Sequence, residues 1–298
     1  MNTLLNTFRL LAVFAAISPS LSAQWPPYAT AGVPRTPDGK PNLSAPAPRA
    51  LDGKPDLSGI WENPRPPAGQ LGEAAATPGF LSGRNAELTP GDGQRGGAAA
   101  GGPPAPNLFR DAGSGFKDGL PLQPWAADLV KKRMADNSKD NPDAHCLPMG
   151  FMQFHNHPQP RKIIQNPGVI LIIYEANSGL RQIFTDGRPL PGNDPQPWWY
   201  GYSIGKWDGD TLVVETSGFI DGGWLDINGN PLTDAAKVTE RFRRVNYGNL
   251  EIEITVDDPK AYTAPWTIKL NQNIVLDTDL IEYVCLENER DLPHLIGK

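Results

Sequence analysis

Three of the four histidines and one of the two cysteines lie within the thirteen residues from His145 to His157. On an extended segment, His155 and His157 would project to the same face, where their imidazoles could bind Zn²⁺ or another divalent metal. Asp143 could complete such a site, which would make the protein a metal-assisted hydrolase. The alternative is a polar loop anchored by a disulfide, since pairing explains Cys146 better than metal binding does.

The carboxylate of Glu240 is a second candidate for chemistry. Residues 237–245 and 250–256 read as two strands of a hairpin, in which a three-residue loop would place Arg243 opposite Glu251. The same register turns Glu240 inward with these apolar side chains: Val238, Phe242, Ile252 and Ile254. A buried carboxylate needs a partner or a raised pKa. Glu240 is therefore either a base of a lyase or isomerase, or a structural acid in an ion pair.

The densest aromatic stretch is residues 195–202. The rings of Trp198, Trp199, Tyr200 and Tyr202 could line the mouth of a binding site and stack on an aromatic ring or a sugar. They could equally close one end of a barrel as part of its core. We predict these four residues, together with Glu240, as ligand-binding residues.

Several function classes lack their sequence signature. The chain contains no Gly-x-Ser-x-Gly elbow, no P-loop, no dinucleotide-binding glycine pattern and no Cys-x-x-Cys. Its formal net charge of −6 comes without a cluster of Lys and Arg, which disfavours a nucleic-acid partner. Nucleophilic hydrolysis by a serine elbow is also unsupported.

Residues 1–23 have the pattern of a secretory signal peptide, with one basic residue, an apolar run and small residues before a cleavage site. No later stretch approaches the ~20 apolar residues of a transmembrane helix. We therefore expect an exported protein, periplasmic or extracellular. In that compartment Cys146 and Cys285 are expected to form a disulfide.

The predicted secondary structure that would position these residues differs between segments of the chain. Residues 24–120 are rich in Pro and Gly and predict an extended or disordered arm, in which residues 38–44 recur almost unchanged at 52–58. Residues 121–149 predict one helix, at 123–136, and a connecting loop.

From residue 150 to 298 the apolar pattern changes to a period of two. Turn signals separate the predicted strands, which are 161–165, 169–176, 180–185, 202–207, 211–216, 237–245, 250–256, 266–274 and 280–286. An antiparallel meander of this length is stable when it closes into a barrel. Gly59-Ile60-Trp61 is similar to the Gly-x-Trp of the first strand in lipocalins, so we predict a mainly β, lipocalin-like barrel.

Five motifs occur in order along the chain: DGKPDLSGIW, DGR, SIGKWDGDTLVVET, TERFRR and DDPKAYT. Together they resemble a family of exported bacterial proteins, frequent in acidobacteria, that has no established function. The resemblance implies the architecture and export, but no catalytic residues. Many members of that family carry histidines where this chain has Leu190, Tyr202 and Leu232, so a metal site of the family would be lost or replaced here.

Three functions follow from these observations. The leading hypothesis is the binding of a small apolar or aromatic molecule inside the barrel. The second is an enzyme that uses either a metal at His155 and His157 or the buried Glu240. The third is an envelope protein that binds a partner through its Pro-rich arm.

Overall fold

The computed structural model describes residues 29–64, 112–136, 138–192 and 196–285. The described residues form two compact units, one of residues 29–32 and 276–278 and the other of the remaining described residues between 33 and 285. In the first unit, the backbone N–H groups of Thr30 and Asp277 each donate to the other residue's side-chain oxygen, at 2.8 and 2.7 Å. The predicted signal peptide lies outside the described residues.

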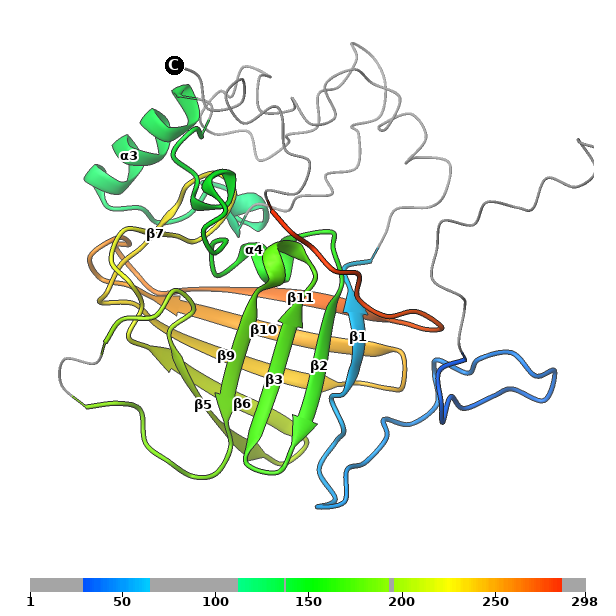
Figure 1. Ribbon diagram of the computed structural model, residues 1–298. Coiled ribbons are helices and arrows are strands. Elements are labelled where there is room, and N and C mark those ends of the chain that lie inside the picture. The colour runs from blue at the N-terminus through cyan, green and yellow to red at the C-terminus, as the bar shows by residue number, and fades with distance from the viewer. Residues whose placement is uncertain (1–28, 65–111, 137, 193–195, 286–298) are drawn as a thin grey trace, which may run out of the picture. The chain divides into compact units, whose positions relative to one another are not determined.

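The second unit contains a closed barrel of nine strands among the described residues (Figure 1), which confirms the predicted mainly β, lipocalin-like fold class. Around the barrel the order is β1, β11, β10, β9, β6, β5, β4, β3 and β2. The strands are β1 (Gly59–Glu62), β2 (Arg161–Asn166), β3 (Val169–Tyr174), β4 (Leu180–Phe184), β5 (Tyr202–Asp208), β6 (Thr211–Ser217), β9 (Lys237–Arg244), β10 (Asn249–Asp257) and β11 (Trp266–Val275). Two short strands, β7 (Gly223–Trp224) and β8 (Pro231–Leu232), pair separately.

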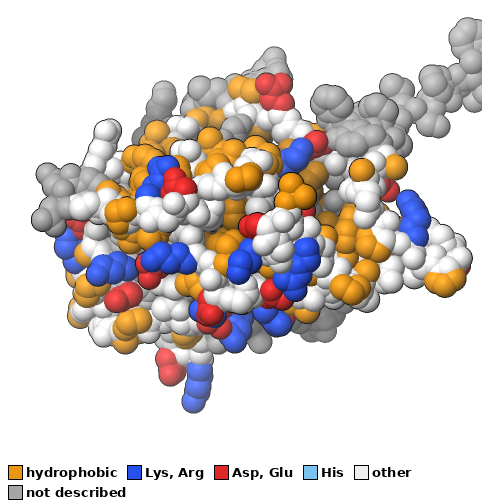
Figure 2. Space-filling view, turned by 90° about the horizontal axis from the view of Figure 1, so that it is seen from below, with side chains coloured by type: hydrophobic (Ala, Val, Ile, Leu, Met, Phe, Trp, Pro, Cys, Tyr) orange, Lys and Arg blue, Asp and Glu red, His pale blue; other side chains and the backbone are white. Residues whose placement is uncertain are grey.

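Alternating side chains separate the barrel core from its surface. On β10 the core residues, each at most 2% exposed, are Leu250, Ile252, Ile254 and Val256. The predicted register is confirmed, since Arg243 lies opposite Glu251 and forms an ion pair with it on the outer face. Figure 2 shows basic and acidic side chains interspersed on one face of the molecule, with no large region of one sign.

The barrel boundaries and one strand pairing differ from the prediction. The first strand, β1, comes from the predicted arm and pairs with both β2 and β11, so the barrel does not begin at residue 150. The pairing of β4 with β5 is parallel, because the long connection 185–201 returns the chain before β5 begins. Residues 280–285 form no strand.

Contacts between residues that are distant in sequence hold β1 in place. Trp61 is fully buried and donates its indole N–H to the carbonyl of Leu57, at 3.0 Å. The guanidinium of Arg244 lies 4.9 Å from the centre of the Trp61 ring and donates to the carbonyls of Asp56 and Ser58. These contacts bury the Trp61 ring. The Gly-Ile-Trp motif is too short for its sequence pattern to predict that burial.

The two copies of the sequence repeat form the same turn. In each, a backbone N–H donates to the carbonyl four residues later, from Thr36 to Lys40 and from Ala50 to Lys54. The first copy contacts the β9–β10 turn, where the N–H of Gly248 donates to the carbonyl of Leu43. The described part of the predicted arm in this unit is therefore bound to the barrel.

The predicted helix is present as α3 (Pro124–Ala135), and a second helix, α4 (Gln153–Asn156), was not predicted. Among the described residues, short 3₁₀ helices occur at η2 (Ala112–Gly115), η3 (Pro142–His145) and η4 (Ala176–Ser178). In Figure 1, α4 lies across one end of the barrel. Within the described ranges, no helix combines the length and the apolar character needed to cross a bilayer.

Candidate functional site

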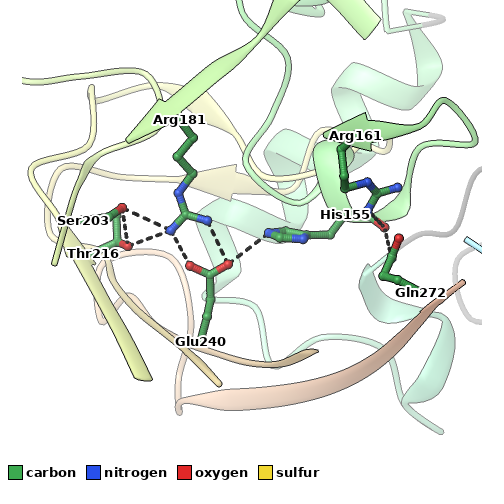
Figure 3. A network of polar contacts seen from close by, with 7 residues as sticks. All are labelled: His155, Arg161, Arg181, Ser203, Thr216, Glu240 and Gln272. Carbon is green, nitrogen blue, oxygen red and sulfur yellow. Dashed lines mark hydrogen bonds and ion pairs between the residues drawn. The ribbon is translucent and has the colours of Figure 1, made fainter. Parts of the chain in front are cut away.

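A polar cluster lies inside the barrel, centred on Glu240 of β9 and Arg181 of β4 (Figure 3). Nη1 of Arg181 donates to Oε1 of Glu240 at 2.9 Å, and Nη2 donates to Oε2 in a second, very short contact. Both side chains are at most 2% exposed. Glu240 is fully buried, which confirms its predicted inward direction. A charged carboxylate in an apolar interior needs such a partner.

Two hydroxyl groups complete the surroundings of the Arg181 guanidinium. Nη2 of Arg181 also donates to Oγ of Ser203 on β5 and to Oγ1 of Thr216 on β6, at 3.1 and 3.0 Å. The two hydroxyls lie 2.9 Å apart and share a hydrogen bond. Four strands therefore position one guanidinium.

The third member of the cluster is His155, which α4 carries into the barrel (Figure 3). Its Nε2 lies 3.0 Å from Oε1 of Glu240, although the ring is turned out of hydrogen-bond geometry. Burial lowers the pKa of His155, and although Glu240 opposes this, Arg181 and Arg161 add to it. The imidazole is therefore neutral at pH 7.

Two further residues hold the backbone of α4. Arg161 of β2 donates from Nη1 to the carbonyl of His155 at 3.1 Å, and Gln272 of β11 donates from Nε2 to the same carbonyl at 3.3 Å. Both side chains are buried. Their contacts place the single turn of α4 against the strand residues of the cluster.

The charges of the cluster follow from burial and from neighbouring groups. Burial would raise the pKa of Glu240, but attraction to Arg181 and contacts with His155 and Arg181 outweigh it and lower the pKa to about 2. Burial lowers the pKa of Arg161 to about 10 and raises that of Tyr174 to about 12. At neutral pH the cluster contains two cations, one carboxylate and a neutral phenol.

Several buried polar atoms of this cluster have no hydrogen-bond partner within the described part of the chain. They are Nε of Arg161, Nε of Arg181, Nδ1 of His155, Oη of Tyr174, Oδ1 of Asn156 and Oε1 of Gln272. More than nine in ten buried polar groups in proteins are satisfied, so this concentration at one place is unusual. The two arginine nitrogens and the tyrosine hydroxyl are donors, whereas the two amide oxygens are acceptors.

Aromatic and aliphatic side chains surround the polar cluster. The Arg181 guanidinium lies 4.7 Å from the centre of the Phe151 ring, and Phe151 packs edge-on against Phe219 at 5.5 Å. The apolar part of the interior is filled and leaves no space for a water molecule between its lining residues, Leu57, Ile163, Ile170, Ile172, Ile183, Leu212 and Phe242. A ligand could enter only if side chains moved.

The geometry assumed for the metal site at His155 and His157 is wrong. His155 belongs to the helical turn α4, whereas His157 is the extended residue that follows it, so the two do not lie on one extended segment. His157 follows the end of α4, and burial lowers its pKa to about 4. Among the described residues, no three side chains of His, Cys, Asp or Glu are grouped as metal ligands would be.

The predicted aromatic residues do not gather around one cavity. Tyr200 packs edge-on against Phe154 of α4, at 4.4 Å between ring centres. Tyr202 instead stacks with Phe184, and its neighbour Trp198 is 39% exposed. Trp199 is half-buried.

Sequence reasoning missed Arg181, although a signal for it exists. In β4, Arg181 and Ile183 are two residues apart and therefore face the same side of the sheet. An arginine on the apolar face of a strand indicates a buried cation, which needs an acid such as Glu240. Ser203 and Thr216 carry no comparable signal.

The predicted disulfide is present. Cys146 and Cys285 are bonded, with 5.6 Å between their Cα atoms. The bond joins the segment that precedes α4 to residues 279–285 beyond the barrel.

The chain was compared with protein-family models, with curated proteins and with solved structures. No family model matches it, and neither a curated protein nor a solved structure shows significant similarity to it.

Proposed function

We propose that this protein binds a small aromatic carboxylate inside the barrel, next to α4. The observation that carries the proposal is the group of buried, unpartnered polar atoms around His155. Leaving such an atom unsatisfied costs about 1–3 kcal/mol, so a ligand that supplies partners gains affinity there.

The chemistry of the unpartnered atoms favours an anion. Nε of Arg161 and Nε of Arg181 are N–H donors on cations, and Oη of Tyr174 is a neutral donor. A carboxylate accepts several hydrogen bonds, and such charge-assisted bonds are stronger than neutral ones. Oε1 of Gln272 is an acceptor that suits a hydroxyl or amine on the same ligand.

The surrounding side chains favour a flat apolar body on that anion. Phe151 packs beside Arg181, and Phe242 lies 6.4 Å from the His155 ring, measured between ring centres. Aromatic rings pack well in edge-on and offset arrangements against such side chains. An aromatic acid would therefore match both halves of the site.

Entry requires α4 to move, because the interior is filled. This helix has four residues, and isolated helices this short have little stability of their own. Its displacement would withdraw His155 and Phe154 from the interior. We propose that the ligand then occupies part of that volume.

The site supports binding better than catalysis by Glu240. With a pKa of about 2 and two hydrogen bonds from Arg181, this carboxylate has little basicity at neutral pH. The disulfide fits an oxidising compartment, and we propose export through the signal peptide. A partner of the Pro-rich arm stays a prediction, although the described part of that arm in the barrel unit contacts its own barrel.

Ligand-observed NMR can test the proposal with benzoate, cinnamate and indole-3-acetate as probes and cinnamyl alcohol as the neutral control. The wild-type protein should bind at least one of the acids more tightly than the alcohol. Arg161→Lys should weaken acid binding by about tenfold, since one charge-assisted bond is worth roughly 1.5–3 kcal/mol. The matched control is Arg133→Lys, a buried arginine of α3 that stacks on Trp224.

Circular dichroism must show that both variants are folded. Failure of the folded wild-type protein to bind any of the three acids would contradict the proposal. Equal binding of cinnamate and cinnamyl alcohol, or equal losses in the two variants, would also contradict it.

A further inference from the structure

A row of aromatic rings lies on the outer face of the barrel, where β4 meets β5. Phe184 and Tyr202 stack at 5.1 Å between ring centres with an interplanar angle of 29°. Trp198 continues the row, 5.3 Å from Tyr202. Arg181, Ile183 and Ser203 face inward on these strands, so their neighbours Phe184 and Tyr202 face outward. We call Phe184, Tyr202 and Trp198 the aromatic platform.

Hydrogen bonds hold the backbone of Trp198, the exposed member of the platform. The N–H of Trp198 donates to Gly218 at 2.9 Å, and its carbonyl accepts from Ile220 at 3.0 Å and from Gly201 at 3.2 Å. Its side chain is nevertheless 39% exposed. A ligand that stacks on Trp198 would order a side chain whose backbone is already held, which lowers the entropy cost of binding.

A charged pair, Arg188 and Asp186, lies against the aromatic platform, with Arg188 over the face of the Phe184 ring. The guanidinium of Arg188 is 4.0 Å from the centre of the Phe184 ring and donates from Nη1 to the Tyr202 hydroxyl at 3.4 Å. Asp186 accepts hydrogen bonds from Nε and Nη2 of Arg188. Both charged side chains are partly exposed to solvent.

We propose that the aromatic platform binds a pyranose ring of a polysaccharide. A sugar presents an apolar C–H face, which would stack on Trp198, and a rim of hydroxyls, which suits the planar groups of Asp186 and Arg188. A small apolar molecule usually needs an enclosed pocket that buries most of its surface. An open platform suits a sugar, which keeps much of its hydration when it binds.

Affinity electrophoresis tests the proposal with hydroxyethylcellulose, xylan and laminarin as probes, each in its own native gel. At least one polymer should retard the wild-type protein relative to serum albumin. Trp198→Ala should lose most of the retardation, corresponding to an affinity at least tenfold lower, and Trp198→Tyr should retain part of it because it keeps an aromatic ring. The matched control is Trp125→Ala on α3, whose side chain is 47% exposed.

The outcomes of this experiment test sugar binding by the aromatic platform and not ligand binding inside the barrel. Retardation that Trp198→Ala loses and Trp125→Ala keeps supports the proposal. Lack of retardation in all three gels, or equal retardation of the two alanine variants, would overturn it. Arg161→Lys should be retarded like the wild type, because Arg161 is buried inside the barrel and the platform lies on its outer face.

Discussion

Arg181 and Glu240 form a buried ion pair between β4 and β9, two strands that are not neighbours in the barrel. The two strands between them, β5 and β6, contribute Ser203 and Thr216 to the same guanidinium. The pair therefore spans the interior and links four strands. A buried pair with these extra hydrogen bonds favours one arrangement of the strands, because any other leaves charges uncompensated.

Removing the charge of Glu240 should destabilise the protein strongly. Glu240→Gln leaves the Arg181 cation buried beside a neutral amide, and breaking a buried pair on one side costs about 3–5 kcal/mol. Urea denaturation measures this loss. The matched control is Glu251→Gln, which removes the exposed partner of Arg243 and should cost less than about 1 kcal/mol. Equal losses in the two variants would contradict the structural role of the buried pair.

Stability should fall in mildly acidic solution. Burial lowers the pKa of His155, and it lowers that of His157 to about 4, whereas histidine in an unfolded chain titrates near 6.5. Below about pH 6.5 the unfolded chain therefore binds protons that the folded protein does not. The free energy of unfolding should decrease as the pH falls from about 6.5 towards 4, by up to about 1.4 kcal/mol per pH unit for each histidine.

Urea denaturation between pH 7.5 and about pH 4.5 checks this slope. His157→Gln should reduce the slope, because it removes one of the two histidines whose pKa burial lowers. The lowered pKa of Glu240 acts in a separate window: its contribution is present above about pH 4.5 and is lost as the pH falls through about 2. A stability that stays constant from pH 7.5 to 4.5 would be inconsistent with buried neutral histidines.

The disulfide should contribute measurably to stability. Cys146 and Cys285 are separated by 139 residues, and closing so long a loop is worth roughly 4–5 kcal/mol in the chain-entropy model. Reduction of the wild-type protein, or the double variant Cys146→Ser/Cys285→Ser, should lower the free energy of unfolding by about 2–5 kcal/mol. The double variant should then not respond to reductant, and a further shift in its midpoint would contradict the assignment.

Two glycines with similar backbone angles should differ in their tolerance of alanine. Gly201 has φ of 64°, and a Cβ there would lie 2.6 Å from Cγ2 of Thr216. Gly209 has φ of 60° in the β5–β6 turn, where a Cβ would meet no atom within 4 Å. Gly209→Ala should cost about 1 kcal/mol from backbone strain alone. Gly201→Ala should cost about 2–4 kcal/mol because the clash is added to the strain; thermal denaturation with equal melting temperatures would contradict this difference.

Local sequence patterns were sufficient to predict much of the barrel. Alternation at residues 250–256 and the turn before it predict the pairing of Arg243 with Glu251 and the inward direction of Glu240, and both are confirmed. The fold class and the Cys146–Cys285 bond could also be predicted. These features depend on side-chain period, turn residues and cysteine count, all of which are readable within short stretches.

Contacts between distant segments were decided only in the tertiary structure. Barrel closure brings β1 from the Pro-rich arm between β2 and β11, and it brings Arg181 to Glu240 across two strands. The same closure lets α4 insert His155 beside that pair, whereas the metal-site hypothesis had assumed an extended segment there. No local period specifies which distant segments meet, because that depends on how the whole barrel buries its charges and its apolar surface together.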